Sequence, residues 1–112
     1  MIHDMMKLGA LAEFVKVWAD TKGLLKKENS AKQMLKVTEE IGEVAAAVAR
    51  DDMDKLKDGI GDGFVTLIIL AHQNGLTPEE CLEAAWDEIK GRTGKMIDGV
   101  FVKSEDLTKG DV

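Results

Sequence analysis

Five acidic side chains stand close together in the sequence, in two groups that each span about one helical turn. Glu39, Glu40 and Glu43 form the first group, and Asp58 and Asp62 follow after a short acidic connection. Carboxylates without imidazole or thiolate suit a hard cation such as Mg2+ or Mn2+. On two antiparallel helices joined at that connection, each group would lie about two turns, or roughly 10 Å, from the bend. The spacing therefore permits one cation site built from both helices.

The three glutamates taken alone are also typical of an ordinary solvated helix face. At about 100° per residue they fall within an arc of about 100°, nearly opposite the apolar stripe of their own helix. That stripe consists of Val37, Ile41, Val44 and Val48. A metal site is favoured over a solvated face only if another part of the chain supports it.

The two aspartates give this support because they lead into an apolar segment. The sequence FVTLIILA, residues 64–71, is apolar around the whole circumference of a helix, which predicts cover by neighbouring helices or a second subunit. Asp58 and Asp62 share a row with Val65 or Ile69, so we expect them to continue a buried stripe. Buried carboxylates are costly unless they are paired or bind a metal, and no Lys or Arg lies between Asp58 and Ile69.

Two other kinds of metal site do not fit the sequence. Ferritin-like di-iron bundles use Glu-x-x-His pairs, but neither His3 nor His72 has a Glu three residues before it. An EF-hand loop counted from Asp52 lacks Gly at its sixth position and Glu at its twelfth. Cys81 is the single cysteine, which excludes an internal disulfide and a zinc knuckle.

The composition is that of one folded domain, residues 1–112, with a core at about 8–103 and a polar tail at 104–112 that we expect to be frayed. The net charge of -6 argues against binding to a nucleic acid polymer. The longest largely apolar run, Phe64 to Ala71, is far short of the roughly 20 residues that a membrane span needs. The lone cysteine fits a reducing cytoplasm, and a chain of 112 residues often gains buried surface by association, so we expect a homodimer or homotetramer.

Helical periodicity and turn signals predict an all-α chain with a small C-terminal β-hairpin. We expect four helices: one that ends at Lys22-Gly23, one from about Ala31 to Arg50 capped by Asn29 or Ser30, one from about Met53 to Asn74, and one from Pro78 to about Lys90. Thr77 and Glu80 form a capping-box pattern around the start of the fourth helix. Asp98-Gly99, between short apolar flanks, is a two-residue hairpin signal.

Two segments together resemble a known family. KVTEEIGEV, followed by KDGIGDGFVTLIILA, is similar to the EExxE and ExxD signature of the MazG-like nucleoside triphosphate pyrophosphohydrolases. The ending EIKGRTGKMIDGVFVKSEDL resembles a small form common in bacteriophages and bacteria, and the similarity extends from about Trp18 to Leu107. The resemblance implies a MazG-like helical bundle in the cytoplasm, the host's for a phage protein. It implies metal-dependent cleavage of a nucleoside or deoxynucleoside triphosphate between the α and β phosphates, which releases a monophosphate and pyrophosphate.

The resemblance also assigns roles to the acidic residues. Glu40 and Glu43 correspond to metal ligands, Glu39 to a candidate base or water-orienting residue, and Asp62 to the final Asp of ExxD. The Glu of ExxD falls on Gly59, which has no side chain. We expect Asp58, one residue earlier, to take its place as a ligand of Mg2+ or Mn2+.

A triphosphate near so many carboxylates also needs cations. The candidates for binding phosphates are four basic residues: Lys36, Lys90, Arg92 and Lys95. Lys90 matches a Lys that often contacts the nucleotide in the family, whereas Asp87 stands where Asn is common. Structural alternatives apply to all four, because Lys36 could pair with Glu40 and the others could complement the dipole at the end of the fourth helix.

Trp18 has two interpretations as well. It could stack on the base of a nucleotide, but its place in the stripe of Leu11, Phe14 and Val15 favours core packing. The alternative function for the whole chain is a non-enzymatic helical oligomer, a regulatory or interaction module with a structural cation site.

Overall fold

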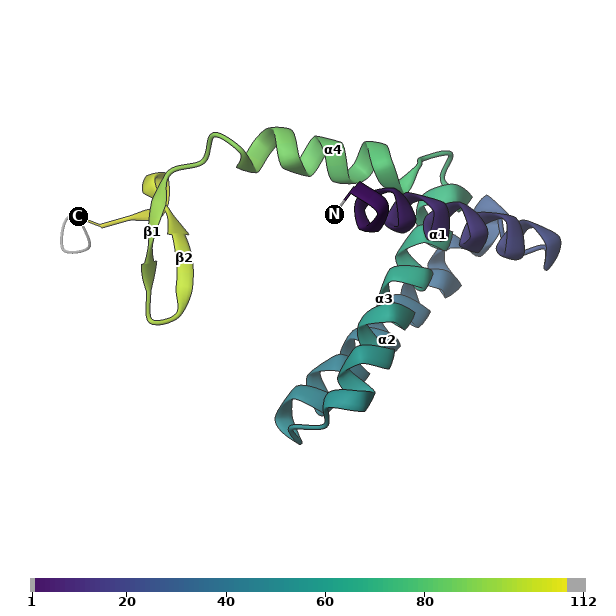
Figure 1. The fold of residues 1–112 in the computed structure, drawn as a ribbon, viewed down its shortest axis with the longest axis horizontal. Coiled ribbons are helices and arrows are strands. Elements are labelled where there is room, and N and C mark those ends of the chain that lie inside the picture. The colour runs from purple at the N-terminus through teal and green to yellow at the C-terminus, as the bar shows by residue number, and fades with distance from the viewer. Residues whose placement is uncertain (1, 109–112) are drawn as a thin grey trace. The chain divides into compact units, whose positions relative to one another are not determined.

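A computed structural model describes residues 2–108 of the protein (Figure 1). Its helices are α1 (Ile2–Thr21), α2 (Ser30–Ala49), α3 (Met53–Gln73) and α4 (Pro78–Ile89), and its strands are β1 (Gly94–Ile97) and β2 (Val100–Lys103). Two short 3-10 helices, η1 (Lys27–Asn29) and η2 (Ser104–Asp106), complete the described elements. The predicted fold class, four helices followed by a small hairpin, is confirmed. Residues 104–106 of the predicted tail form η2, and 109–112 lie outside the described residues.

The helices begin and end where the turn chemistry predicts. The Oδ1 atom of Asp52 accepts a hydrogen bond from the backbone N–H of Lys55 at 3.1 Å, which caps α3. In the capping box of α4, the N–H of Glu80 donates to Oγ1 of Thr77 at 3.1 Å, and the N–H of Thr77 donates to Oε1 of Glu80 at 2.7 Å. Asn29 is the last residue of η1 and directly precedes α2, where its side chain makes no capping bond.

The hairpin follows from its turn. Strands β1 and β2 are antiparallel, with Ile97 opposite Val100. Asp98 and Gly99 both have positive φ, 50° and 81°, as a type I′ turn requires. Gly adopts a positive φ without steric cost and Asp tolerates it, so an Asp-Gly dipeptide favours this hairpin turn.

The chain divides into two compact units, one that ends at Cys81 and one that begins at Leu82. The first holds α1, α2, α3 and the first turn of α4. The second holds the remainder of α4, the hairpin and η2. No helix among the described residues is long and apolar enough to cross a membrane.

In the first unit, α2 and α3 run side by side as an antiparallel pair (Figure 1). The bend between them is tight because Asp51 adopts φ 52° and the N–H of Asp52 donates to the carbonyl of Ala47 at 3.0 Å, as in a Schellman motif. Beyond the bend, glycines let the two backbones approach. A Cβ added at Gly59 would lie 3.0 Å from Cγ2 of Val44 on α2.

The buried row of α3 differs from the predicted one. It consists of Gly59, Gly63, Thr66, Ile69 and Gln73. Asp58 and Asp62 are exposed, so the prediction that they continue a buried stripe is wrong for this chain. The physical reason is that the small residues, one position further along, are the ones that face α2.

Large apolar side chains remain uncovered within the chain. Phe64 and Leu67 on α3 are 56% and 47% exposed, so α2 and α1 cover only part of the segment that we predicted to be covered all round. On α1, Phe14 is 65% and Trp18 is 52% exposed, whereas the neighbouring Ala19 is fully buried. Within residues 2–108, Trp18 is therefore only partly covered, and the core packing favoured by its sequence position is not found there.

Candidate functional site

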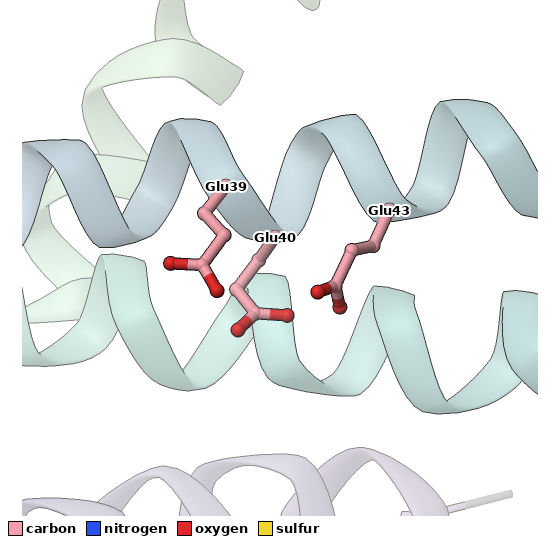
Figure 2. Close-up of side chains that lie close together, drawn as sticks. All are labelled: Glu39, Glu40 and Glu43. Carbon is pink, nitrogen blue, oxygen red and sulfur yellow. The ribbon is translucent and has the colours of Figure 1, made fainter.

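One turn of α2 brings the three glutamates together. Glu39, Glu40 and Glu43 leave the same side of the helix (Figure 2), and each offers a carboxylate oxygen that lies within 4.8 Å of the others. Positions 39, 40 and 43 cluster in this way because residues three and four apart lie on one helical face. The first of the two predicted carboxylate groups is therefore a compact set of oxygen donors.

Glu40 is the most unusual member of this set. It is half-buried, and its Oε2 atom has an accessible surface below 1 Å2 without a hydrogen-bond partner among the described residues. Burial raises the pKa of Glu40, and the charges of Glu43, Asp62 and Glu39 raise it further. A buried carboxylate oxygen without a donor, surrounded by like charges, is unfavourable unless a cation compensates it. The predicted solvated face does not describe this residue.

The aspartates of α3 lie across from this turn. Asp62 is close enough to raise the pKa of Glu40 through its charge. Asp58 and Asp62 line, together with Glu43, a hollow of about 380 Å3 between α2 and α3. In the part of the chain that the structure describes, however, only the three glutamates form a group with all ligand atoms within 4.8 Å. The structure thus brings both aspartates and Glu43 to one hollow, whereas Glu39 and Glu40 do not line it and neither aspartate belongs to the closest set.

The packing of Gly59 explains why a longer side chain is absent there. Its backbone faces Val44, and an added Cβ would already be at 3.0 Å from the valine methyl group. Asp58 precedes it and opens onto the hollow. The prediction that Asp58 replaces the missing glutamate remains a prediction, and its position at the hollow is compatible with it.

The predicted phosphate-binding cations all have acidic neighbours except one. Lys36 lies 3.6 Å from Glu39, so it pairs with Glu39 and not with Glu40, the partner that we considered from the sequence. The other three candidates belong to the second unit: Lys90 is 3.0 Å from Asp87, Arg92 is 3.5 Å from Glu88, and Lys95 lies on β1. The pairs of Lys36 and Lys90 are more than half exposed, and such pairs are weak enough to exchange for a phosphate, whereas the Arg92 side chain is only 25% exposed. Contact of these residues with a nucleotide stays a prediction, as it does for Trp18.

Two charged residues of the hollow were missed by the sequence analysis. Arg50 and Lys55 line it on either side of the α2–α3 bend. The signal was present, because the antiparallel arrangement that we predicted places the residues flanking the bend at the same end of the helix pair.

The donor set fits the kind of metal that we predicted. All candidate ligands are carboxylate oxygens, which hard divalent cations such as Mg2+ and Mn2+ prefer. The buried Oε2 of Glu40, which lacks a donor among the described residues, is the observation that calls for a positive charge at this place. Four residues would hold the ion: Glu40, Glu43, Asp58 and Asp62.

Comparison with known proteins identifies the family. The family model for the MazG nucleotide pyrophosphohydrolase domain matches residues 28–97, which include both carboxylate groups. A curated relative described as "uncharacterized 18.2 kDa protein in rep-hol intergenic region", from Haemophilus phage HP1 (strain HP1c1), is 40% identical over 70 residues. The match covers 62% of this chain but 43% of the relative, so this chain spans less than half of that protein. No solved structure matches significantly. Because the family model covers more than half of its residues, the chain belongs to the MazG nucleotide pyrophosphohydrolase domain family.

Proposed function

We propose that the protein is a nucleoside triphosphate pyrophosphohydrolase that requires Mg2+, for which Mn2+ can substitute. Its products would be a ribo- or deoxyribonucleoside monophosphate and pyrophosphate. The MazG family is metal-dependent and acts on nucleotides, which supports the reaction class. The single observation that carries the proposal to this chain is the buried, unpartnered Oε2 of Glu40 within the close set of three glutamates.

Each carboxylate has a role in this proposal. Glu40, Glu43, Asp58 and Asp62 hold the cation. When bound, the cation offsets the negative charge of the triphosphate, polarises the α-phosphoryl group and makes bound water more acidic. Glu39 would orient or deprotonate the attacking water. Its side chain is more than half exposed, so water can reach its carboxylate.

Cations of the chain would bind the other groups of the substrate. Lys36 lies 3.6 Å from Glu39 and would bind a phosphate near the attacked bond. Lys90, Arg92 and Lys95 would bind further phosphate oxygens, and Trp18 would stack on the base. The identity of the base and of the sugar is left open by these residues.

The reaction is tested by separating the products. Purified protein should convert at least one of a panel of canonical and damaged ribo- and deoxyribonucleoside triphosphates to monophosphate and pyrophosphate with Mg2+, and chelator should stop it. Release of diphosphate and orthophosphate as the first products would contradict cleavage between the α and β phosphates. A melting temperature that rises with Mg2+, without turnover of any nucleotide, would instead support the alternative of a structural cation site.

We further propose that the chain assembles as a homodimer or homotetramer. The half-exposed Phe14, Phe64 and Leu67 support this, because apolar side chains of this size on two packed helices are typical of surfaces that a partner covers. Light scattering at micromolar concentration should give a mass of at least two chains of 12.2 kDa. A stable monomer over a tenfold range of micromolar concentrations would contradict the assembly.

A further inference from the structure

Two cations share the hollow with the candidate metal ligands. Arg50 follows the last turn of α2, and Lys55 lies in the first turn of α3. Among residues 2–108, neither has a carboxylate oxygen within the 4.0 Å that defines an ion pair. Both side chains are exposed, and no carboxylate among the described residues holds either of them, so both can turn to an anion in the hollow.

The positions of the two cations along the helices are matched. Arg50 follows Glu43 by seven residues on α2, and Lys55 precedes Asp62 by seven residues on α3. Seven residues are about two turns, or roughly 10 Å, and return to the same face of a helix. In the hollow, Glu43 and Asp62 therefore lie about two turns from the bend, and Arg50 and Lys55 lie near it. Asp52 also lines the hollow at the bend, where its carboxylate caps α3.

Helix dipoles treat the two cations differently. Arg50 at the C-terminal end of α2 is favourable there without any ligand. Lys55 is in the first turn of α3, where the dipole disfavours a positive charge, although its backbone N–H is engaged by Asp52. An anion in the hollow would offset this unfavourable interaction, because it would attract Lys55 and would lie near the N-terminal end of α3.

We propose that Arg50 and Lys55 bind the pyrophosphoryl group, both as the β and γ phosphates of the substrate and as the pyrophosphate released. This inference rests on the proposed function. Arg offers a planar fork that bonds two phosphate oxygens, and Lys offers a point charge. The hollow of about 380 Å3 is within the range of about 300–1,000 Å3 that is usual for small-molecule sites. The cleaved bond then lies at the carboxylates, and the leaving group is held towards the bend.

The experiment is a calorimetric titration with inorganic pyrophosphate at a fixed concentration of free Mg2+. Wild type is compared with Arg50→Gln, Lys55→Gln and the control Lys57→Gln, whose residue is exposed on the same helix but does not line the hollow. Loss of one charged hydrogen-bond partner should raise the Kd for pyrophosphate about tenfold in each of the first two variants. The control and the affinity for nucleoside monophosphate should be unchanged, and circular dichroism verifies each fold.

The outcomes separate this inference from the proposed function. If wild type hydrolyses a triphosphate but both hollow variants bind pyrophosphate like wild type, the inference is wrong and the function stands. If no triphosphate is hydrolysed but the two variants lose pyrophosphate affinity, the anion site stands and the function is wrong. Absence of pyrophosphate binding to wild type, or an equal loss of affinity for monophosphate, also overturns the inference.

Discussion

Glu40→Gln should abolish metal-dependent turnover while raising the melting temperature of the metal-free protein. The substitution removes a charge whose Oε2 is buried without a partner among the described residues and whose neighbours Glu43, Asp62 and Glu39 are all negative. Without metal, the substitution therefore stabilises the folded state, because an unpaired buried charge is unfavourable. With metal, the substitution removes one ligand of the cation. The loss of turnover should be at least about 100-fold, the upper end of what removal of a mere outer-shell partner costs.

The pH dependence of stability should follow the same residue. Burial and the charge of Glu43 raise the pKa of Glu40 above its ordinary value of 4.5. A raised pKa means that the folded state holds the proton more tightly than the unfolded state. Stability of the metal-free protein is thus greatest, as far as this group is concerned, below pH 4.5, and it falls as the pH rises through the raised pKa. In Glu40→Gln this contribution should vanish, which a comparison of melting temperatures across that pH range measures.

A matched control is Glu13→Gln, which removes an exposed carboxylate from α1. It should change neither turnover nor the metal-free melting temperature appreciably. If Glu40→Gln keeps wild-type turnover, or if it lowers the metal-free melting temperature, Glu40 is not the strained carboxylate that we infer.

Asp58→Asn should lower turnover by about 10- to 100-fold and raise the Mg2+ concentration needed for half-maximal rate. Asp58 shares the hollow with Glu43 and Asp62, but of the two aspartates only Asp62 raises the pKa of Glu40 through its charge, which favours contact of Asp58 with the metal through water. The loss should therefore be smaller than for Asp62→Asn or Glu43→Gln. Rates measured against Mg2+ concentration distinguish the three variants.

The control for this series is Asp54→Asn, which lies in the first turn of α3 but does not line the hollow. Its turnover should be that of wild type. Gly59→Glu should not rescue Asp58→Asn, because its Cβ would crowd Val44 at 3.0 Å before the carboxylate could reach the hollow. If Asp58→Asn retains wild-type rate and metal dependence while Asp62→Asn and Glu43→Gln are inactive, Asp58 is not part of the metal site.

The elements of the fold were predictable because their signals are local. Periodicity places each helix, and caps and turns fix its ends, as Asp52, Thr77 and Asp98-Gly99 illustrate. The row of α3 that would be buried was not predictable in the same way. An apolar pattern predicts burial from large apolar side chains. Gly59 and Gly63 have no such side chain, and for that reason their backbone can pack closely against α2.

The candidate site was predicted in its residues more than in its environment. Residue types and spacing gave the five carboxylates, the resemblance assigned roles to four of them, and the structure places them on the neighbouring helices α2 and α3. The burial of one oxygen of Glu40 depends on how closely α3 approaches, which helical angles on α2 alone do not contain. The charges of Arg50 and Lys55 became relevant only once the bend placed them in the same hollow.

The central claim is that the glutamates of α2, with Asp62 across from them, form a divalent cation site. The most direct test is a calorimetric titration of the metal-free protein with Mn2+, without nucleotide, for wild type and Glu40→Gln. We predict saturable binding to wild type that the substitution removes or weakens at least about tenfold. Absence of binding to wild type, or equal affinity in both proteins, would contradict the claim.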